Sequence, residues 1–413
     1  MSRANWQNIP LKRIVSSVQS GTSVNGAPWP AQDDELGVLK TSAVYGGVFR
    51  PAENKQVDSY DMDRVSCPVL AGSLIVSRMN TKQHLGVAAA VPQDHPNLYL
   101  PDRLWAVAFR GADPRFIDWW TKTPAYRTQV EAVCVGTSSS MQNISQGDFL
   151  ELRIDLPDPE TQGAIADYLD REMARIDTLI EEQQRLIEML RERRRAVCLT
   201  AVTRGVDDGV KLIESGDPAI GPMPAHWALR AVRHWLVSLD GSRIPLSAEE
   251  RGNRQGVFDY YGASGVIDRV DDFLFDEPLV LVSEDGANLL ARSTPISFAV
   301  KGRYWVNNHA HVLRPIAGDV DFWASRLEAL DVSPVVSGSA QPKLTAGALM
   351  ALRVSAPTDI DEQRRIGAYL GEQTVKIDRL IAETESFIEL SQERRAALIT
   401  AAVTGQIDVR EVA

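Results

Sequence analysis

The chain has 413 residues, of which 44% are hydrophobic and 24% are charged, and its formal net charge is −11. Because this length exceeds that of one ordinary compact domain, we expect two domains with connecting segments. Three widely spaced cysteines without CxxC or metal-ligand spacing argue against a disulfide framework and favour a reducing compartment. The chain shows no apolar signal core at its start and no run of about 18 apolar residues, so we expect a cytoplasmic protein without a membrane partner.

The distribution of charge is more informative than the net charge, which taken alone argues against binding to nucleic acid. Residues 1–158 contain 15 Lys and Arg against 16 Asp and Glu, and residues 225–357 contain 13 against 15. Both segments are therefore close to neutral, and each could present one basic face. Most of the negative charge lies in the other segments, where we expect protein partners.

Residues 1–158 are predicted to fold as an α+β domain. Their β-rich segments are short and are separated by Gly, Pro, Asn and Asp. The expected strands lie at residues 37–41, 73–77, 104–109 and 152–156. A long helix is predicted to follow over residues 159–205.

A linker is predicted over residues 206–224, which are rich in Gly, Pro and Asp. A second α+β domain is expected over 225–357, a second long helix over 358–404 and a tail over 405–413. The strands of this second domain are expected at residues 279–283, 296–300, 311–313 and 352–354. The ends of the two domains match each other in sequence but their interiors do not, so we expect two domains with different targets.

The two predicted helices are copies of one segment. Residues 162–207 align without a gap to residues 363–408, at a constant offset of 201 positions, and 19 of the 46 aligned positions are identical. Chance does not produce this agreement, so the chain consists of two copies of one unit, a globular domain followed by a long helix.

Apolar residues in both long segments recur in alternating steps of four and three, which is the pattern of a coiled-coil seam. The predicted seam residues are Leu169, Ile176, Ile180, Ile187, Leu190, Leu370, Ile377, Ile381, Ile388 and Leu398. Neither helix can bury this stripe alone, so we expect an antiparallel coiled coil with pseudo-two-fold symmetry. Arg194 and Arg395 occupy equivalent polar seam positions. The alternative is that each helix packs only on its own domain.

Motifs that carry catalytic chemistry are missing from the sequence. There is no GxxxxGK[ST] phosphate loop, no Gly-rich adenosylmethionine loop, no Asn-Pro-Pro-Tyr-like motif, no GxSxG and no HExxH. We therefore expect no catalytic residue and no cofactor. His309 and His311 could ligate a metal with Glu284 or Asp285, but a hydrogen-bonded strand start is the favoured interpretation, so no metal site is predicted.

With this organisation, the chain resembles the specificity subunits of type I restriction-modification enzymes. The helical repeats at 162–203 and 363–404 look like that family's two conserved regions. Stretches at 261–265, 284–287 and 305–313, and in the first domain at 77–81 and 136–144, look like parts of its target recognition domains. The resemblance implies a non-catalytic subunit whose two domains each read one half of a bipartite, asymmetric DNA site. It also implies three partners: double-stranded DNA, two methyltransferase subunits, and motor-nuclease subunits in the full complex.

Polar and basic residues in turn-rich stretches are the candidate DNA contacts, because Arg and Lys suit phosphate or guanine, and Asn and Gln suit adenine. In the first domain they are Lys40, Thr41, Tyr45, Arg78, Asn80, Lys82, Ser139, Gln142 and Asn143. In the second they are Arg243, Arg254, Tyr261, Ser264, Asn288, Arg292, Asn307, Asn308, His309 and Lys343. Two other functions stay open: a coiled-coil adaptor that binds only proteins, which the acidic net charge would suit, and an enzyme with a metal at His309 and His311.

Overall fold

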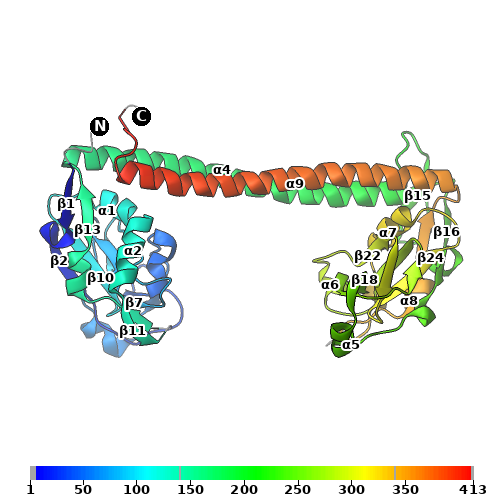
Figure 1. The fold of residues 1–413 in the computed structure, drawn as a ribbon, viewed down its shortest axis with the longest axis horizontal. Helices are drawn as coiled ribbons and strands as arrows, with labels where there is room; N and C mark the ends of the chain where they lie inside the picture. Colours follow the sequence, from blue (N-terminus) through cyan, green and yellow to red (C-terminus); the bar gives the residue numbers. More distant parts are fainter. Residues whose placement is uncertain (1–5, 139–140, 339–340, 411–413) are drawn as a thin grey trace. The chain divides into compact units, whose positions relative to one another are not determined.

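The structure, a computed structural model, describes residues 6–138, 141–338 and 341–410 and divides into two compact units. Unit 1 comprises Met1–Gln183 and Ser386–Ala413, and unit 2 comprises Gln184–Glu385. Each unit holds one globular domain and one part of each of two long helices, α4 (Pro159–Arg204) and α9 (Ile360–Val403) (Figure 1).

The first domain contains two four-stranded sheets, which confirms its predicted α+β class. The antiparallel sheet has the order β2 (Val15–Ser20), β10 (Leu104–Phe109), β6 (Leu74–Ser77) and β8 (Ala88–Ala90). The mixed sheet has the order β4 (Asn54–Gln56), β3 (Gly37–Leu39), β9 (His95–Tyr99) and β5 (Pro68–Val69). Strands β3 and β9 of the mixed sheet run parallel, whereas its other pairs are antiparallel.

Smaller elements complete the first domain. Strand β1 (Gln7–Pro10) pairs with β13 (Arg153–Leu156), which leads directly into α4. A three-stranded sheet has the order β11 (Val135–Ser138), β12 (Met141–Asn143) and β7 (Met79–Asn80). The helices are α1 (Pro114–Thr121), α2 (Pro124–Val133), α3 (Gln146–Glu151) and the 3-10 segments η2 (Leu11–Arg13), η3 (Thr41–Gly47) and η4 (Ser59–Arg64).

The second domain also contains two four-stranded sheets. The antiparallel sheet has the order β17 (Leu236–Ser238), β24 (Ala310–Pro315), β21 (Leu279–Ser283) and β22 (Ser297–Val300). The mixed sheet has the order β19 (Gly265–Val270), β18 (Gln255–Gly262), β23 (Arg303–Val306) and β20 (Phe275–Asp276). Here β18 and β23 form the parallel pair.

Two strand pairs and several short helices complete unit 2. Strand β16 (Ala228–Ala231) pairs with β25 (Arg353–Ala356), which leads into α9. The predicted linker contains a hairpin of β14 (Leu212–Glu214) and β15 (Pro222–Pro224). The helices are α5 (Ala248–Asn253), α6 (Asn288–Ala291), α7 (Val320–Glu328), α8 (Ala346–Ala351) and the 3-10 segments η5 (Val232–His234), η6 (Asp240–Ser242) and η7 (Ser333–Val335).

The two domains share one topology although their interiors share no sequence pattern. The order β2-β10-β6-β8 corresponds to β17-β24-β21-β22, and the order β4-β3-β9-β5 corresponds to β19-β18-β23-β20 with its central parallel pair. The internal repeat therefore extends through the sheets of both domains. Helix α2 and the three-stranded sheet β11-β12-β7 have no counterpart in this correspondence.

Each domain core extends into the long helices. In unit 1, Ile165 and Leu169 of α4 and Ile399 and Val403 of α9 are buried in one cluster with the domain's own aromatic residues. In unit 2 the roles are exchanged, since the start of α9 and the end of α4 join the core of the second domain. In each unit, apolar residues of both long helices therefore belong to the core of the domain.

The long helices pack together and run antiparallel in both units, as predicted. In unit 1, Asp177 of α4 pairs with Arg395 of α9. In unit 2, Arg194 of α4 pairs with Asp378 of α9 at 2.8 Å. These ion pairs are counterparts in the repeat, because each residue's equivalent lies 201 positions away. Arg194 and Arg395, which occupy equivalent polar positions of the seam, therefore each meet a carboxylate on the opposite helix.

The predicted seam residues are buried or partly buried in the helix pair. Buried are Leu169, Ile176, Ile187, Leu190, Leu370 and Ile377, and partly buried are Ile180, Ile381, Ile388 and Leu398. Among the helices in the described ranges, none combines the length and hydrophobicity needed to cross a membrane. The described part of the predicted tail folds back on unit 1, where Val409 is buried in the core cluster.

Candidate nucleic-acid interface

In the first domain, several predicted DNA contacts meet at the end of strand β7. The Tyr45 hydroxyl lies 3.3 Å from the Thr41 hydroxyl and accepts a hydrogen bond of 3.0 Å from Nδ2 of Asn80. The ring of Tyr45 also stacks on the His84 ring, with centroids 3.9 Å apart and planes only 6° from parallel. We call Thr41, Tyr45, Asn80 and His84 the tyrosine cluster.

The amide of Asn80 is already occupied inside this cluster. Its Nδ2 also lies 3.2 Å from the Ser77 hydroxyl, and its Oδ1 accepts from the Thr81 backbone amide at 2.9 Å. A bidentate contact with adenine needs both amide atoms at once. In this conformation Asn80 therefore holds the Tyr45 hydroxyl in place and is not available for a bidentate contact.

Strand β12 places two more predicted residues beside this cluster. Gln142 and Asn143 lie opposite Asn80 and Met79 in the β12–β7 pair. Oδ1 of Asn143 is buried and has no hydrogen-bond partner within the described residues. Lys40 immediately precedes η3, whereas Ser139 lies outside the described residues.

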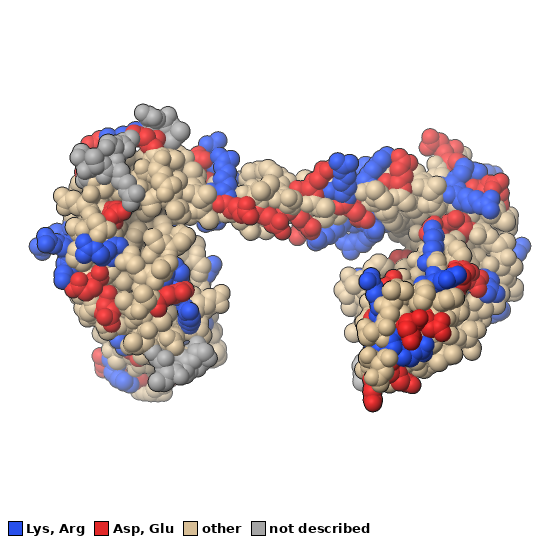
Figure 2. All heavy atoms as spheres, in the orientation of Figure 1, with Lys and Arg blue, Asp and Glu red and all other residues tan. Residues whose placement is uncertain are grey.

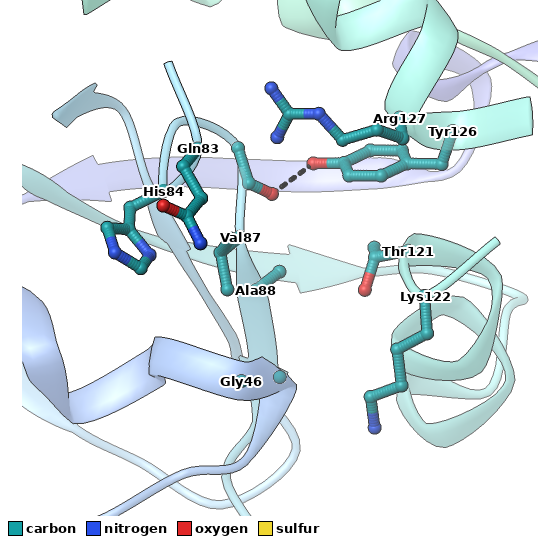
Figure 3. A pocket seen from close by; sticks show the side chains of 11 residues that line it. Gly46, Gln83, His84, Val87, Ala88, Thr121, Lys122, Tyr126 and Arg127 are labelled. Carbon is teal, nitrogen blue, oxygen red and sulfur yellow. Dashed lines mark hydrogen bonds between the residues drawn. The ribbon is translucent and has the colours of Figure 1, made fainter. Parts of the chain in front are cut away.

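A cavity of about 360 Å³ opens next to the tyrosine cluster (Figure 3). Gln83 and His84 line it from one side, and Lys122, Tyr126 and Arg127 from the other. Its two cations already have partners, since Lys122 pairs with Asp118 at 2.9 Å and Arg127 with Glu131 at 2.9 Å. Burial raises the pKa of Asp118, although Lys122 opposes this effect. No pattern in the sequence pointed to His84 or to this cavity.

In the second domain, the predicted contacts gather around Glu284 at the end of β21. Arg243 donates to the Glu284 carboxylate at 2.7 Å, and Lys343 lies 3.2 Å from its other oxygen. His309 meets the neighbouring Asp285 at 2.8 Å, and its backbone amide donates to Oδ1 of Asn307 at 2.7 Å. We call Arg243, Glu284, Asp285, Asn307, His309 and Lys343 the glutamate cluster.

His311 and Asp240 lie beside the glutamate cluster. His311 is 1% exposed; its Nδ1 lies 2.6 Å from Asp240, and its Nε2 lies 2.8 Å from the Leu344 carbonyl oxygen. Both ring nitrogens therefore face acceptors, which favours the imidazolium form. Burial alone lowers the pKa of His311, but these two hydrogen bonds outweigh it and raise the pKa above 6.5.

The carboxylates of this region are held in their charged forms. Burial alone raises the pKa of Asp240, but its hydrogen bonds to His311 and to the Val312 amide outweigh burial and lower the pKa below 3.8. The pKa of Glu284 is lowered in the same way: burial raises it, and Arg243, His311 and Lys343 outweigh that effect. Opposite charges thus compensate each other here, and side chains of both signs lie together on this domain (Figure 2).

Several other predicted contacts are engaged elsewhere in their own domains. Arg292 donates to carbonyl oxygens at the end of α7, at Glu328 and Leu330, and Arg254 pairs with Asp271 while covering the Trp305 ring. Arg78 donates to the Asp102 carbonyl oxygen and Lys82 pairs with Glu131.

The remaining predicted contacts of the second domain are neutral residues. Asn288 donates to the Thr294 carbonyl oxygen, and Tyr261 packs against Tyr304. Ser264 and Asn308 are exposed in turns. The structure thus separates contacts that serve the fold from those that face outward.

The described residues contain no group of three or more His, Cys, Asp and Glu side chains arranged to hold a metal ion. His309 is exposed in the turn before β24, whereas His311 is buried within that strand. The two histidines therefore do not converge on one point, and each has its own carboxylate partner.

Comparisons with known proteins agree with this architecture. Residues 237–386 match the family model described as "Type I restriction modification DNA specificity domain". The specificity subunit of the type I restriction enzyme EcoEI from Escherichia coli is 26% identical over 155 residues, which cover 37% of this chain and 26% of that protein. The match thus spans about a quarter of that relative's length. The resemblance to specificity subunits that the sequence suggested is confirmed.

Two solved structures share the fold over nearly the whole chain. The HsdS subunit from Thermoanaerobacter tengcongensis has a TM-score of 0.59 at 17% identity and covers 98% of this chain and 97% of its own. A chain from a structure of complex assembly in a type I R-M system has a TM-score of 0.65 at 15% identity, with 98% of both chains covered. At these identities the likeness concerns the fold, and it confirms the predicted α+β domains with two long helices that pack together.

Proposed function

We propose, from the match of residues 237–386 to the type I restriction modification DNA specificity domain, that this chain is the DNA-recognition subunit of such a complex. Each globular domain reads one half of a bipartite, asymmetric site in double-stranded DNA. The chain itself is non-catalytic and supports two methyltransferase subunits, with motor-nuclease subunits in the full complex. The observation that carries this proposal is the family match of a domain whose topology is repeated in the other half of the chain.

The tyrosine cluster and the glutamate cluster support a division of recognition between the domains. Both contain residues predicted as DNA contacts, and they lie at the ends of the equivalent strands β6 and β21 or just beyond them. Their chemistry differs, since the first presents an aromatic ring and hydroxyl groups and the second presents paired charges. Different groups at equivalent places would read different half-sites with one common geometry.

The helix pair supplies a surface for the methyltransferase partner. Leu186, Met189 and Leu380 in unit 2, and Phe387 and Leu390 in unit 1, are 36–60% exposed although they are large and apolar. Large apolar side chains left exposed on these helices support the proposal that a partner binds there. By contrast, Glu383 and Glu385 already pair with Arg379 and Arg191, so the acidic face is partly engaged within the helices.

The direct test is DNA binding and methylation by the chain produced together with a methyltransferase subunit. Methylation-sensitive sequencing should report one asymmetric bipartite motif, and a gel shift should show binding to duplexes that contain it. Met189→Glu together with Leu390→Glu should weaken assembly, whereas Glu383→Lys should have a smaller effect. A complex that assembles but shows no sequence preference would refute the proposal and favour a protein-only adaptor.

The proposal also gives the helices a role as a spacer between half-sites. One heptad adds about 10.5 Å to a helix, and B-DNA rises about 3.4 Å per base pair. Heptads inserted after Gln184 and Glu385 should therefore leave both half-site sequences unchanged while lengthening the gap by up to about three base pairs. Because three base pairs also rotate the duplex by roughly 100°, methylation at the lengthened gap should be weaker than wild-type methylation at the native gap. Undiminished methylation at the original gap would exclude the spacer role.

A further inference from the structure

One buried glutamine lies at the start of each long helix, where the helix leaves its domain. Gln162 is 0% exposed and Gln363 is 2% exposed, and they are equivalent positions of the repeat. Glutamine is rarely so fully buried unless its amide is hydrogen-bonded. Neither residue belongs to the coiled-coil seam or to the candidate DNA contacts, so their burial needs another explanation.

Both glutamines make the same two hydrogen bonds to backbone groups of their own domain. Nε2 of Gln162 donates to the Pro157 carbonyl oxygen at 2.8 Å, and its Oε1 accepts from the Asp113 amide at 2.8 Å. In unit 2, Gln363 donates to the Pro357 carbonyl oxygen at 2.9 Å and accepts from the Asp319 amide at 3.3 Å. Each glutamine thus joins the long helix to the segment that follows the last strand and to the residue that begins α1 or α7.

The aspartates whose backbone amides donate to the two glutamines also hold the start of a helix in each domain. Asp113 and Asp319 cap α1 and α7, since their carboxylates accept from the Arg115 and Phe322 amides. In unit 2, Gly318 lies so close to Gln363 that a Cβ on Gly318 would lie 2.0 Å from Oε1 of Gln363. Gly318 also has a φ of +113°, which side-chain-bearing residues rarely adopt. The second junction therefore requires glycine at this position.

We propose that Gln162 and Gln363 are positioning residues that fix the angle of each recognition domain on its helix. This inference rests on the proposed function. If the domains read separate half-sites, a domain that tilts on its helix will accept half-sites at altered separations. Selectivity for a single gap length would then depend on these two amides as well as on the length of the helices.

The test measures selectivity for the gap in the complex with the methyltransferase subunit. The duplexes keep the two half-sites found for the wild type and vary the gap by one or two base pairs. In Gln162→Met and Gln363→Met, methylation at the native gap relative to the altered gaps should fall by roughly five- to thirtyfold, because a lost restraint cannot exceed the one or two hydrogen bonds it contained. The half-site sequences themselves should not change.

Gly318→Ala tests the same junction from outside the helix, because the added methyl group must displace Gln363. It should relax gap selectivity in the same direction as Gln363→Met. If the methionine variants do not fold, Gly318→Ala alone carries the test, at the second junction. The control is Thr123→Ala, which removes the buried cap of α2 within the domain. It should lower the melting temperature and leave gap selectivity unchanged.

The outcomes separate this inference from the proposed function. Relaxed gap selectivity with unchanged half-sites in the glutamine variants, and not in Thr123→Ala, supports the positioning role. Variants that are less stable yet keep wild-type gap selectivity would overturn it while leaving DNA recognition intact. A wild-type complex without a bipartite preference would overturn the proposed function, and this inference with it.

Discussion

The two globular domains carry the same backbone frame and different side chains on it. In both, an antiparallel sheet lies beside a mixed sheet with one central parallel pair, and the last strand leads into a long helix past a buried glutamine. On the first domain the predicted DNA residues form an aromatic and amide cluster around Tyr45. On the second they surround the paired carboxylate of Glu284. The two domains are thus attached to their helices in the same way, and we expect their different surface side chains to determine which half-site each one binds.

Exchanging one domain should change DNA recognition more than any single substitution. Replacing about residues 8–155 with the first domain of another specificity subunit keeps α4, α9 and unit 2. Since recognition would lie on the domain surface, one half-site should change completely while the other half-site and the gap remain. Methylation-sensitive sequencing reports all three features. A change in both half-sites would show that the domains do not read DNA independently.

Removing one member of the buried pair in the second domain should have the next largest effect. Asp240→Ala leaves the His311 imidazolium without its carboxylate, which typically costs about 3–5 kcal/mol of unfolding free energy. Chemical denaturation monitored by fluorescence measures this loss. Asp276→Ala is the matched control, because its ion pair with Arg303 is about half exposed and should contribute under about 1 kcal/mol. Equal losses in both variants would mean that the buried pair is not structural.

The same pair gives the second domain a pH dependence. The pKa of His311 in the folded state lies above 6.5, so its stabilising effect is complete below that pH and is lost as the pH rises through the folded value. The pKa of Asp240 lies below 3.8, so its contribution is complete above 3.8 and is lost as the pH falls further. Stability should therefore decline from about pH 6 towards alkaline pH. The decline should be absent in His311→Gln, and its persistence there would assign it to other groups.

The long helices and the strands next to them were predictable because their signals are local. A repeat with a seam pattern identified α4 and α9 and their antiparallel pairing, and β-rich runs such as 104–109 and 279–283 became β10 and β21. The strand order within the two domains was not predictable. Strand order depends on which faces are buried together, and different apolar side chains can fill equivalent positions.

The candidate site was predictable only in part, for a physical reason. Residue type suggested that Arg243, Arg292 and Asn80 contact DNA, but their partners Glu284, Glu328 and Tyr45 are 41, 36 and 35 positions away in sequence. No local pattern reveals such pairing. His84 was missed for the same reason, since its role depends on stacking with Tyr45 across 39 positions of sequence.

Removing the Tyr45 hydroxyl should have a smaller effect, which should be confined to binding of the first half-site. Tyr45→Phe keeps the ring stacked on His84 but deprives Nδ2 of Asn80 of an acceptor. Loss of one hydrogen bond of about 1 kcal/mol should weaken binding to the first half-site about fivefold. Titration of duplexes altered in one half-site at a time measures this difference. Tyr60→Phe is the control, since that side chain is 72% exposed and its hydroxyl contacts only Asp58 among the described residues. Equal weakening of both half-sites would argue against a local role.

The smallest effects are expected where the two units are most alike. Arg194→Ala and Arg395→Ala each remove one of the two equivalent ion pairs between α4 and α9. The arginine side chains are 39% and 35% exposed, so solvent screening should limit each loss to about 0.2–1 kcal/mol. Double-mutant cycles with Asp378→Ala and Asp177→Ala isolate the pair energies, which should agree between the units within about 0.5 kcal/mol. A clearly larger value in one unit would show that the repeat has diverged in the helix pair as well as on the domain surfaces. Equal and small values would leave the apolar seam, rather than its polar positions, as the main source of helix pairing.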